Sequence, residues 1–263
     1  MTQLLDHGFV TLVERMSDEK AITDAARISY SNDRQVRTGD ATLLRYLMRN
    51  AHWTPFEMPM MRFHVKCPIF VARQWMRHRS GAFNEMSARY TDMKDEFYVP
   101  AEDQLLTQST DNKQGRSGQK AKVDPQVLQG VHDHAYEVYE EATSLGLARE
   151  LARGVLPVNL YTQFYWQVNL RNLLHFLELR LHPHAQYEIR VYAEAIAEMV
   201  KEHYPNVWQA FKDYHLDAVT FTGPELEFLK VTATESDVRD STLTKREQDE
   251  FLAKVSSLTH HNS

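Results

Sequence analysis

The chain has 263 residues, of which 43% are hydrophobic and 25% are charged, a composition typical of a soluble globular protein with a substantial core. The formal net charge of -6 argues against general affinity for nucleic acids or anionic membranes, since such binding draws on net positive surfaces. A single cysteine, Cys67, excludes an intrachain disulfide, and without a signal peptide or an apolar run of roughly 18 to 20 residues we expect a cytoplasmic protein with no membrane span.

The first half of the chain predicts a helix, a strand and a second helix. Apolar residues recur at helical spacing over 40–51, where Asp40 takes the N-cap position. Residues 60–67 alternate between apolar and polar side chains, which indicates a half-buried strand. Pro68 then suits the first turn of a short helix that leads toward Gly81.

The middle of the chain predicts a loop followed by a long helix. Residues 101–122 are polar and rich in Gly, Ser, Asn and Gln, so we expect a surface loop. Asp124 and the proline after it open a long helix with an apolar stripe, and Gly146 ends it. We expect His132 and His134 on this helix to face solvent.

The second half adds one strand, two helices and a tail. Alternation over 159–168 predicts a strand rich in aromatic and β-branched residues, and apolar periodicity over 169–182 and 185–205 predicts helices. The charged segment 231–263 is poor in large apolar residues and is expected to be a tail. We therefore predict an α+β fold with a mixed sheet and flanking long helices, formed as a single domain by residues 1–230.

The window RQWMRHRSGAFNEMSARY, residues 73–90, concentrates cations in a net acidic chain. A solvated basic helix end would also explain these charges. However, large apolar residues alternate with the arginines, so part of the segment must be buried and its guanidinium groups need acceptors. Glu85 alone cannot neutralise them, while Gln74, Asn84 and Ser87 offer neutral hydrogen bonds. The combination predicts a phosphorylated ligand that carries a base.

Other motifs are weaker. Arg153, Arg171 and Arg180 would each fit an ordinary surface arginine, although Arg171 shares a helix face with His175 beside buried leucines. The pair His182 and His184 suggests a metal site, but no H-E-x-x-H pattern accompanies it, and we expect no metal. The chain has neither a P-loop nor a Rossmann glycine pattern, so phosphates must meet arginines.

The stretch RHRSGAFNEMSARY resembles the signature of the flavin-dependent thymidylate synthases, which is Arg-His-Arg, then seven residues, then Ser. The matching residues, with those of the longer signature, are Arg77, His78, Arg79, Asn84, Glu85, Ser87 and Arg89. The segments NAHWTPFEM, ARGVLPVNLYTQFYWQVNLRNLLHFLELR and HAQYEI also look like family segments, so the resemblance spans about 26–211. Two positions depart from it, because Ala82 replaces a usual Ser and His175 stands where many members have Asn.

The resemblance implies reductive methylation of dUMP to dTMP. In that reaction 5,10-methylenetetrahydrofolate supplies the carbon, and FAD reduced by NADPH supplies the hydride. The family's fold is α+β, and its members are homotetramers whose sites are shared between subunits. By resemblance, Arg180 favours ionisation of the uracil imide. Cys67 lies on the apolar face of a predicted strand, where a thiolate is disfavoured, so we expect no cysteine nucleophile.

The resemblance also assigns site residues. Those expected to hold dUMP are Gln74, Arg77, Glu85, Ser87, Ala88, Arg89, Arg153 and Arg180. Those expected to hold FAD are Thr54, Glu57, Arg77, His78, Arg79, Glu85, Asn169, Arg171 and His175. Those expected at the reaction are Arg180, His52 near the flavin, and Ser87, which we expect to bind dUMP rather than to attack it.

Two other functions stay open at this point. A metal-dependent nucleotide phosphohydrolase would use the pair His182 and His184, and would be inhibited by chelators. An RNA-binding module would use the aromatic and basic residues of 73–90, and would show steeply salt-dependent affinity without a cofactor. The net negative charge weighs against the second alternative.

Overall fold

The computed structural model describes residues 1–28, 39–110, 113–222, 244–245 and 247–252. Contacts within the chain divide it into two units, Met1–Asp217 and Ala218–Ser263, and every element described below belongs to the first. The predicted domain boundary near residue 230 lies outside the described residues, and so does most of the predicted tail.

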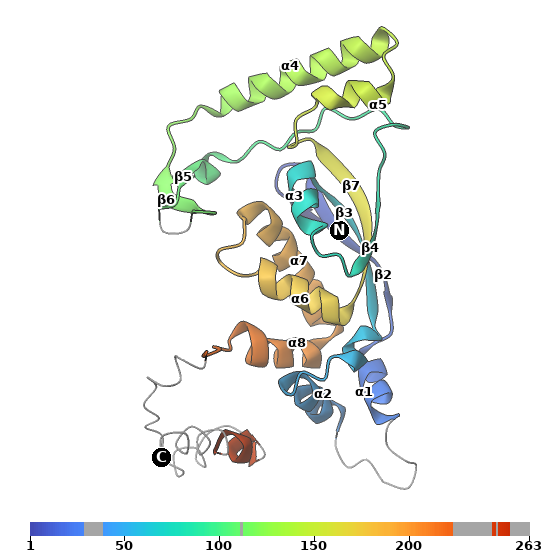
Figure 1. Cartoon of the computed structure of the whole chain (residues 1–263), viewed down its shortest axis with the longest axis vertical. Coiled ribbons are helices and arrows are strands. Elements are labelled where there is room, and N and C mark those ends of the chain that lie inside the picture. Colours follow the sequence, from blue (N-terminus) through green and yellow to red (C-terminus); the bar gives the residue numbers. More distant parts are fainter. Residues whose placement is uncertain (29–38, 111–112, 223–243, 246, 253–263) are drawn as a thin grey trace. The chain divides into compact units, whose positions relative to one another are not determined.

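One antiparallel sheet forms the centre of the first unit (Figure 1). Its strand order is β1-β2-β3-β7-β4, with bounds Thr2–Leu4, Gly8–Met16, Met60–Pro68, Tyr161–Asn169 and Gly81–Glu85. The strands predicted at 60–67 and 159–168 are confirmed as β3 and β7. All pairings in this sheet are antiparallel, so the class α+β is confirmed but the expected mixed sheet is wrong.

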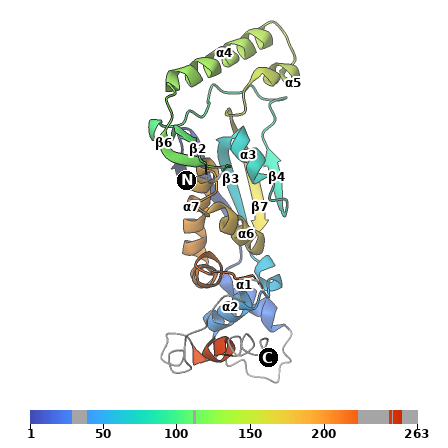
Figure 2. The same ribbon diagram turned by 60° about the vertical axis from the view of Figure 1, so that its left-hand side comes forward.

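Three helices pack on one face of this sheet, α3 (Ile69–Trp75), α6 (Leu170–Arg180) and α7 (Tyr187–His203), as Figures 1 and 2 show. Alternation places Phe63 of β3 and Trp166 of β7 on that face, where both are almost fully buried. The ring of Trp75 lies between the sheet and the helices. Its centroid is 5.3 Å from that of the Trp166 ring and 5.0 Å from that of the Phe176 ring. This aromatic core fixes the end of α3 against α6.

A second group of helices follows β2 and α7 in the chain. The group comprises α1 (Glu19–Arg27), α2 (Asp40–Arg49), the 3₁₀ turn Thr54–Glu57, α8 (Pro205–Phe211) and a π-helical turn, Lys212–Leu216. Helix α2 matches the predicted helix, although Gly39 rather than Asp40 is its N-cap. Helix α8 packs against α2 and α7, which closes this end of the core.

The predicted loop at 101–122 contains a small hairpin, β5 (Leu106–Gln108) and β6 (Arg116–Lys120). The long helix α4 (Pro125–Ser144) follows, with the side chain of Asp124 capping it as predicted, and then α5 (Arg149–Ala152). Within one protomer only His132 and Tyr139 of α4 are buried. The expectation that His132 faces solvent is wrong, because its ring stacks on Phe97 and its Nε2 lies 2.8 Å from Nδ2 of Asn159.

None of the helices in the described part of the chain combines the length and apolar character needed to cross a bilayer.

Candidate active site

The arginine segment joins a helix end to an edge strand. Helix α3 ends at Trp75, and after a short loop the chain enters β4, which pairs with β7. This strand was missed from the sequence, where the segment was interpreted only as a helix leading toward Gly81. A side chain at Gly81 would meet Nε1 of Trp166 at 2.7 Å and the carbonyl oxygen of Gln167 at 2.9 Å. The glycine therefore lets the end of the loop lie directly against β7.

The loop and α6 enclose a cavity of about 310 Å³. Its lining comprises Arg77, His78, Arg79, Ser80, Trp166, Val168, Asn172, His175, Leu179 and Arg180. The structure thus brings together five residues that the sequence had assigned to one site from two distant segments. Within the described residues, the side chains of Arg77 and Arg79 have no hydrogen-bond or ion-pair partner. A cavity with unpaired guanidinium groups suits an anionic ligand.

His78 and Arg180 are joined inside this cavity. Nε of Arg180 donates to Nε2 of His78 at 3.0 Å. Burial, followed by electrostatic interactions with Arg180 and then His175, lowers the pKa of His78 to about 4. The imidazole is therefore neutral at pH 7, and because Nε2 accepts, its proton resides on Nδ1.

A second cavity, of about 290 Å³, lies on the neighbouring face of α6. Asn172 and His175 line both cavities, and Arg171 lines the second. Nη1 of Arg171 donates to the carboxylate of Glu57, which lies in the 3₁₀ turn before β3. The contact joins two residues that the resemblance assigned to FAD.

Three more predicted residues, absent from both cavity linings, make structural contacts. The carbonyl oxygen of the Asn169 side chain accepts from the backbone N–H of Asn172 at 2.9 Å and so caps α6. Glu85 accepts from Oγ1 of Thr162 at 2.7 Å. Nε2 of Gln74 donates to Oε1 of Gln186 at 3.3 Å.

Other predicted residues lie outside both cavity linings. Exposed Arg89 forms an ion pair with Glu150 at 3.3 Å, and Oγ of Ser87 accepts from the N–H of Arg89 at 3.3 Å. Ala88 packs against a smaller hydrophobic cluster that includes Met93 and Tyr139. The remaining predicted residues outside the linings are Arg153, which is exposed, His52, whose ring meets Tyr46 edge-on at 5.7 Å, and Thr54, which begins the 3₁₀ turn.

Several lining residues were not predicted. Asn172, Trp166 and Val168 contribute to the first cavity, and Trp53 contributes to the second. The sequence did place Trp166 and Val168 on the alternating strand, but it gave no sign that they reach a ligand-sized space. Asn172 lies three residues before His175, so helical spacing would have put both on one face.

Cys67 is fully buried on β3. Burial, with a smaller contribution from Glu85, raises the pKa of its thiol well above the ordinary value. A thiolate nucleophile is therefore disfavoured here, as the sequence predicted.

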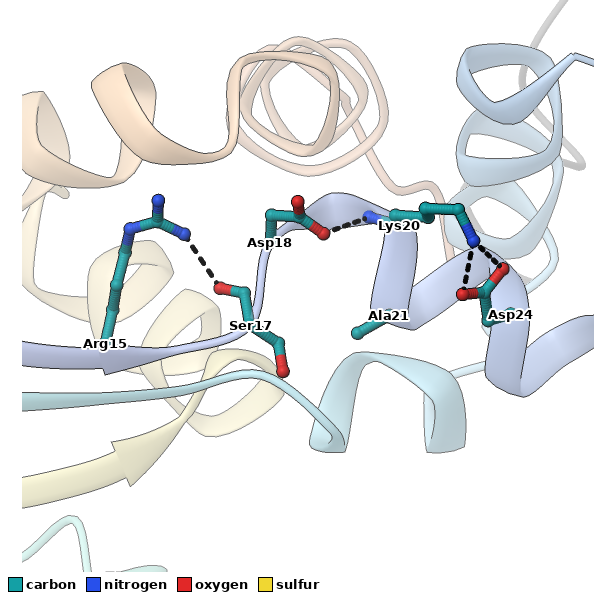
Figure 3. A pocket seen from close by; sticks show the side chains of 6 residues that line it. All are labelled: Arg15, Ser17, Asp18, Lys20, Ala21 and Asp24. Atoms are coloured by element: carbon teal, nitrogen blue, oxygen red, sulfur yellow. Dashed lines mark hydrogen bonds and ion pairs between the residues drawn. The ribbon is translucent and has the colours of Figure 1, made fainter.

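Another hollow, at the start of α1, has the character of local structure (Figure 3). Asp18 caps the helix by accepting from the N–H of Lys20 at 3.0 Å, and Lys20 pairs with Asp24 at 2.6 Å. Nη1 of Arg15 donates to the carbonyl oxygen of Ser17 at 2.9 Å. These charges have partners from their own segment, so nothing in the hollow points to a ligand.

The pair His182 and His184 lies at the end of α6, with ring centroids 4.9 Å apart. Among the residues that the structure describes, His, Cys, Asp and Glu side chains form no group of three or more that could hold a metal ion. Within that part of the chain, the pair is not joined by the additional ligands that a metal-dependent hydrolase would require.

Comparison with known proteins agrees with the signature. A family model described as thymidylate synthase complementing protein matches residues 11–206. A flavin-dependent thymidylate synthase of Gluconobacter oxydans is 48% identical over 260 residues, covering 95% of this chain and 86% of the relative. One from Thermus thermophilus is 49% identical over 230 residues, covering 86% and 84% of the two chains.

A solved structure supports the same relationship. The UMP/dUMP methylase PolB from Streptomyces cacaoi, bound with 5-Br dUMP, is 37% identical to this chain with a TM-score of 0.73, covering 81% of this chain and 98% of the other. The match to the family model, the identities to curated relatives and the shared fold lead to one conclusion: the chain belongs to the flavin-dependent thymidylate synthase family.

Proposed function

We propose that this protein catalyses the reductive methylation of dUMP to dTMP, with FAD as cofactor and without a cysteine nucleophile. The observation that carries the proposal is the cavity in which the signature residues Arg77, His78 and Arg79 meet His175 and Arg180. Curated relatives over most of the chain are flavin-dependent thymidylate synthases, and PolB binds a dUMP analogue. The metal-dependent phosphohydrolase finds no support in these comparisons.

We propose that dUMP is bound by a set of residues that supplies both charged groups and neutral hydrogen-bonding groups. The set is Gln74, Arg77, Glu85, Ser87, Ala88, Arg89, Arg153 and Arg180. Arg77 and Arg153 have no side-chain partner within the described residues, so their charge is available to a phosphate. In the part of the chain that the structure describes, Arg89 pairs with exposed Glu150, an ion pair that water screens.

The chain's own residues also fit a flavin nucleotide. The arginine-lined cavity and its neighbour on α6 share Asn172 and His175, which gives a site with both charge and apolar walls. The residues that would hold FAD are Thr54, Glu57, Arg77, His78, Arg79, Glu85, Asn169, Arg171 and His175, with His52 beside them. When bound and reduced, the flavin supplies the hydride of the reaction.

Arg180 has the central electrostatic role in this proposal. Uracil is a poor nucleophile at carbon five, and the ring becomes more reactive when negative charge spreads over it. The guanidinium of Arg180 keeps its Nη groups unpaired within the described residues, while its Nε is held by neutral His78. A fixed cation of this kind favours the ionised imide, and the buried thiol of Cys67 has no part in the step.

Assembly is a further part of the proposal. Apolar side chains of α4 and α5 are exposed in the protomer, with Val127 at 63%, Val131 at 59% and Leu151 at 64%. An apolar surface of this kind is expected to be covered by another chain. A homotetramer with shared sites would cover it, and could also bring Ser87, Arg89 and Arg153 to a neighbouring cavity. We further propose residues 1–230 as the synthase domain, 231–263 as a tail, and the cytoplasm as location.

The test begins with an absorbance spectrum of FAD-loaded protein, before and after anaerobic addition of NADPH with dUMP. Bleaching of the flavin bands is expected, followed by dTMP formation once methylenetetrahydrofolate is added. A protein that takes up no FAD, or that reduces it without forming dTMP, contradicts the proposal. Omitting dUMP, folate or NADPH in turn provides the controls.

A further inference from the structure

The hairpin β5–β6 contacts the start of α7 through an ion pair in which the carboxylate is buried and the arginine is partly exposed. Nη2 of Arg116, on β6, donates to Oε1 of Glu188, in the first turn of α7. The hydroxyl of Tyr98 donates to the same oxygen at 2.9 Å. Glu188 is only 1% exposed, so its charge depends on these donors. Beside the pair lies a cavity of about 820 Å³, lined in part by Arg116 and Gln186.

The carboxyl group of Glu188 is ionised. Burial opposes the charge, but the hydrogen bond and charge of Arg116, together with a bond from Gln186, hold its pKa below the ordinary value. An ionised carboxylate offers only acceptors. Any amide that meets it must therefore present its nitrogen.

This requirement fixes the orientation of the Gln186 amide and, through it, that of the Gln74 amide. Nε2 of Gln186 donates to Oε2 of Glu188 at 2.9 Å, so the oxygen of the Gln186 amide faces the other way. That oxygen accepts from Nε2 of Gln74 at 3.3 Å. The carbonyl oxygen of Gln74 is then the end of the chain of hydrogen bonds. It is buried and has no partner within the described residues.

We propose that Arg116 and Glu188 are positioning residues for the nucleotide, which act through Gln186 to hold the Gln74 amide with its carbonyl oxygen ready to accept a hydrogen bond from dUMP. The inference rests on the proposed function, in which Gln74 contacts dUMP. It gives strand β6 of the hairpin a role in substrate recognition.

The chemistry of dUMP limits what Gln74 can accept. With its phosphate ionised and before its imide ionises beside Arg180, the nucleotide has two donors, the imide N–H of the ring and the 3′-hydroxyl of the sugar. A buried acceptor left without a partner costs about 1 to 3 kcal/mol, so binding of either donor would relieve that cost. If the Gln74 amide were reversed, its NH2 group would face the N–H or O–H of the nucleotide. Two donors would then meet, and no hydrogen bond would form.

Two variants test the relay at two adjacent links, both far from Gln74. Arg116→Met removes the charge that holds Glu188, and Glu188→Gln replaces an acceptor-only group by an amide that lets Gln186 reverse. We expect the KM for dUMP to rise about tenfold in each, with kcat within about twofold and FAD affinity unchanged, since one oriented hydrogen bond is lost. Lys120→Met is the matched control on the same strand, because within the described residues the ammonium group of Lys120 pairs with exposed Glu102, at 3.4 Å, and not with the relay.

A double-mutant cycle separates positioning from general structure. In a Gln74→Ala background, Glu188→Gln should change the KM for dUMP by less than about twofold, because the group through which it acts is gone. The same factor in both backgrounds would overturn the proposal. Thermal unfolding shows whether each variant is folded. If Glu188→Gln does not fold, the KM effect of Arg116→Met is compared in the wild-type and Gln74→Ala backgrounds instead.

Two substrate analogues identify the donor. Loss of discrimination against 3-methyl-dUMP in Gln74→Ala would identify the ring imide, and loss against the 3′-deoxy analogue would identify the sugar hydroxyl. Unchanged discrimination against both analogues overturns the acceptor role of Gln74.

If wild-type protein forms dTMP but both relay variants match Lys120→Met, only the relay is wrong. If wild-type protein neither binds dUMP nor forms dTMP, the proposed function fails first, and the relay with it.

Discussion

Arg180 and His78 come from elements far apart in the sequence, yet Nε of one donates to Nε2 of the other at 3.0 Å. The bond requires an imidazole that accepts, and the lowered pKa of His78, about 4, keeps the ring in that form at neutral pH. The arginine is thereby held by a neutral partner that does not cancel its charge. Because Arg180 also lines the cavity, its charge remains available to a ligand there.

The titration of His78 predicts a dependence of stability on pH. In the unfolded chain the ring regains its ordinary pKa of 6.5, whereas in the folded chain the pKa is about 4. The neutral ring therefore contributes stability that is fully present above about pH 6.5 and is lost as the pH falls toward 4. Between about pH 7.5 and pH 5, we expect wild-type protein to lose about 1 kcal/mol more than His78→Gln, since solvent reaches part of the ring.

Urea unfolding at both pH values measures this difference. Gln at position 78 keeps an acceptor for Arg180 but does not titrate, so it isolates the protonation of the ring. Equal losses in the two proteins would mean that His78 has an ordinary pKa in the folded state.

Arg180→Ala tests the electrostatic role of the cation. We expect dTMP formation to fall by about 100-fold or more, because a fixed charge that stabilises the developing anion is removed. FAD content, read from the flavin absorbance, should stay close to that of wild type. Lys201→Ala, which removes an exposed charge paired with Glu198, is the control and should keep full activity. Substantial activity in Arg180→Ala would exclude the assigned role.

The contact between Arg171 and Glu57 gives a prediction that separates binding from folding. Both side chains are partly exposed, at 46% and 31%, so Arg171→Met should change the free energy of unfolding by less than about 1 kcal/mol. Its affinity for FAD should fall by about tenfold, because a charged donor is lost from the site. Titration of the apoprotein with FAD measures this, with Lys20→Met, from the exposed pair with Asp24, as control. Unchanged affinity would remove Arg171 from the FAD site.

Cys67→Ala should remain active. The deletion leaves a small cavity in the core and is expected to cost about 1 to 2 kcal/mol of stability. The kcat for dTMP formation should change by no more than about twofold, because the buried thiol takes no part in the reaction. A folded but inactive Cys67→Ala protein would show that the thiol is needed after all.

The exposed apolar residues of α4 predict an effect on assembly. If the proposed tetramer forms, Val131, at 59% exposure, should lie under a neighbouring protomer, and Val131→Glu should yield smaller species than wild type. Analytical ultracentrifugation measures the change, and Glu137→Gln, on the same helix with its side chain 77% exposed, is the control. If Val131→Glu remains tetrameric, this face of α4 is not the contact surface.

Local patterns were sufficient to predict the elements that carry the cavity. Strand β3 alternates strictly, and Asp124 with Pro125 marks the start of α4, so neither depends on distant residues. Strand β4 was missed, because its five residues alternate only weakly and become a strand by pairing with β7. In α4 the apolar stripe was recognised, but its exposure in one protomer could not be, since burial depends on partners rather than on periodicity.

In the active site too, local patterns could be predicted from the sequence, whereas contacts between distant segments could not. The signature placed Arg77, His78 and Arg79 together because they are adjacent in the chain. The bond between His78 and Arg180 could not be foreseen, since it depends on how Trp75 packs between the sheet and α6. Nor did the sequence connect Arg116 with Gln74, because that relay passes through three separate segments.

The close contact at Gly81 has a consequence for how a ligand would be received. The loop of residues 76–80, which carries Arg77 and Arg79, is attached at one end to α3, whose Trp75 is fully buried. At its other end it joins β4, where Gly81 lies so close to Trp166 that no side chain would fit. With so few residues between two fixed points, the loop has little conformational entropy left to lose. The ordering of its guanidinium groups is achieved during folding, so more of the contact energy remains for affinity. Gly81→Ala should loosen that tether and weaken affinity, although Gly81 is not among the residues that line the cavity.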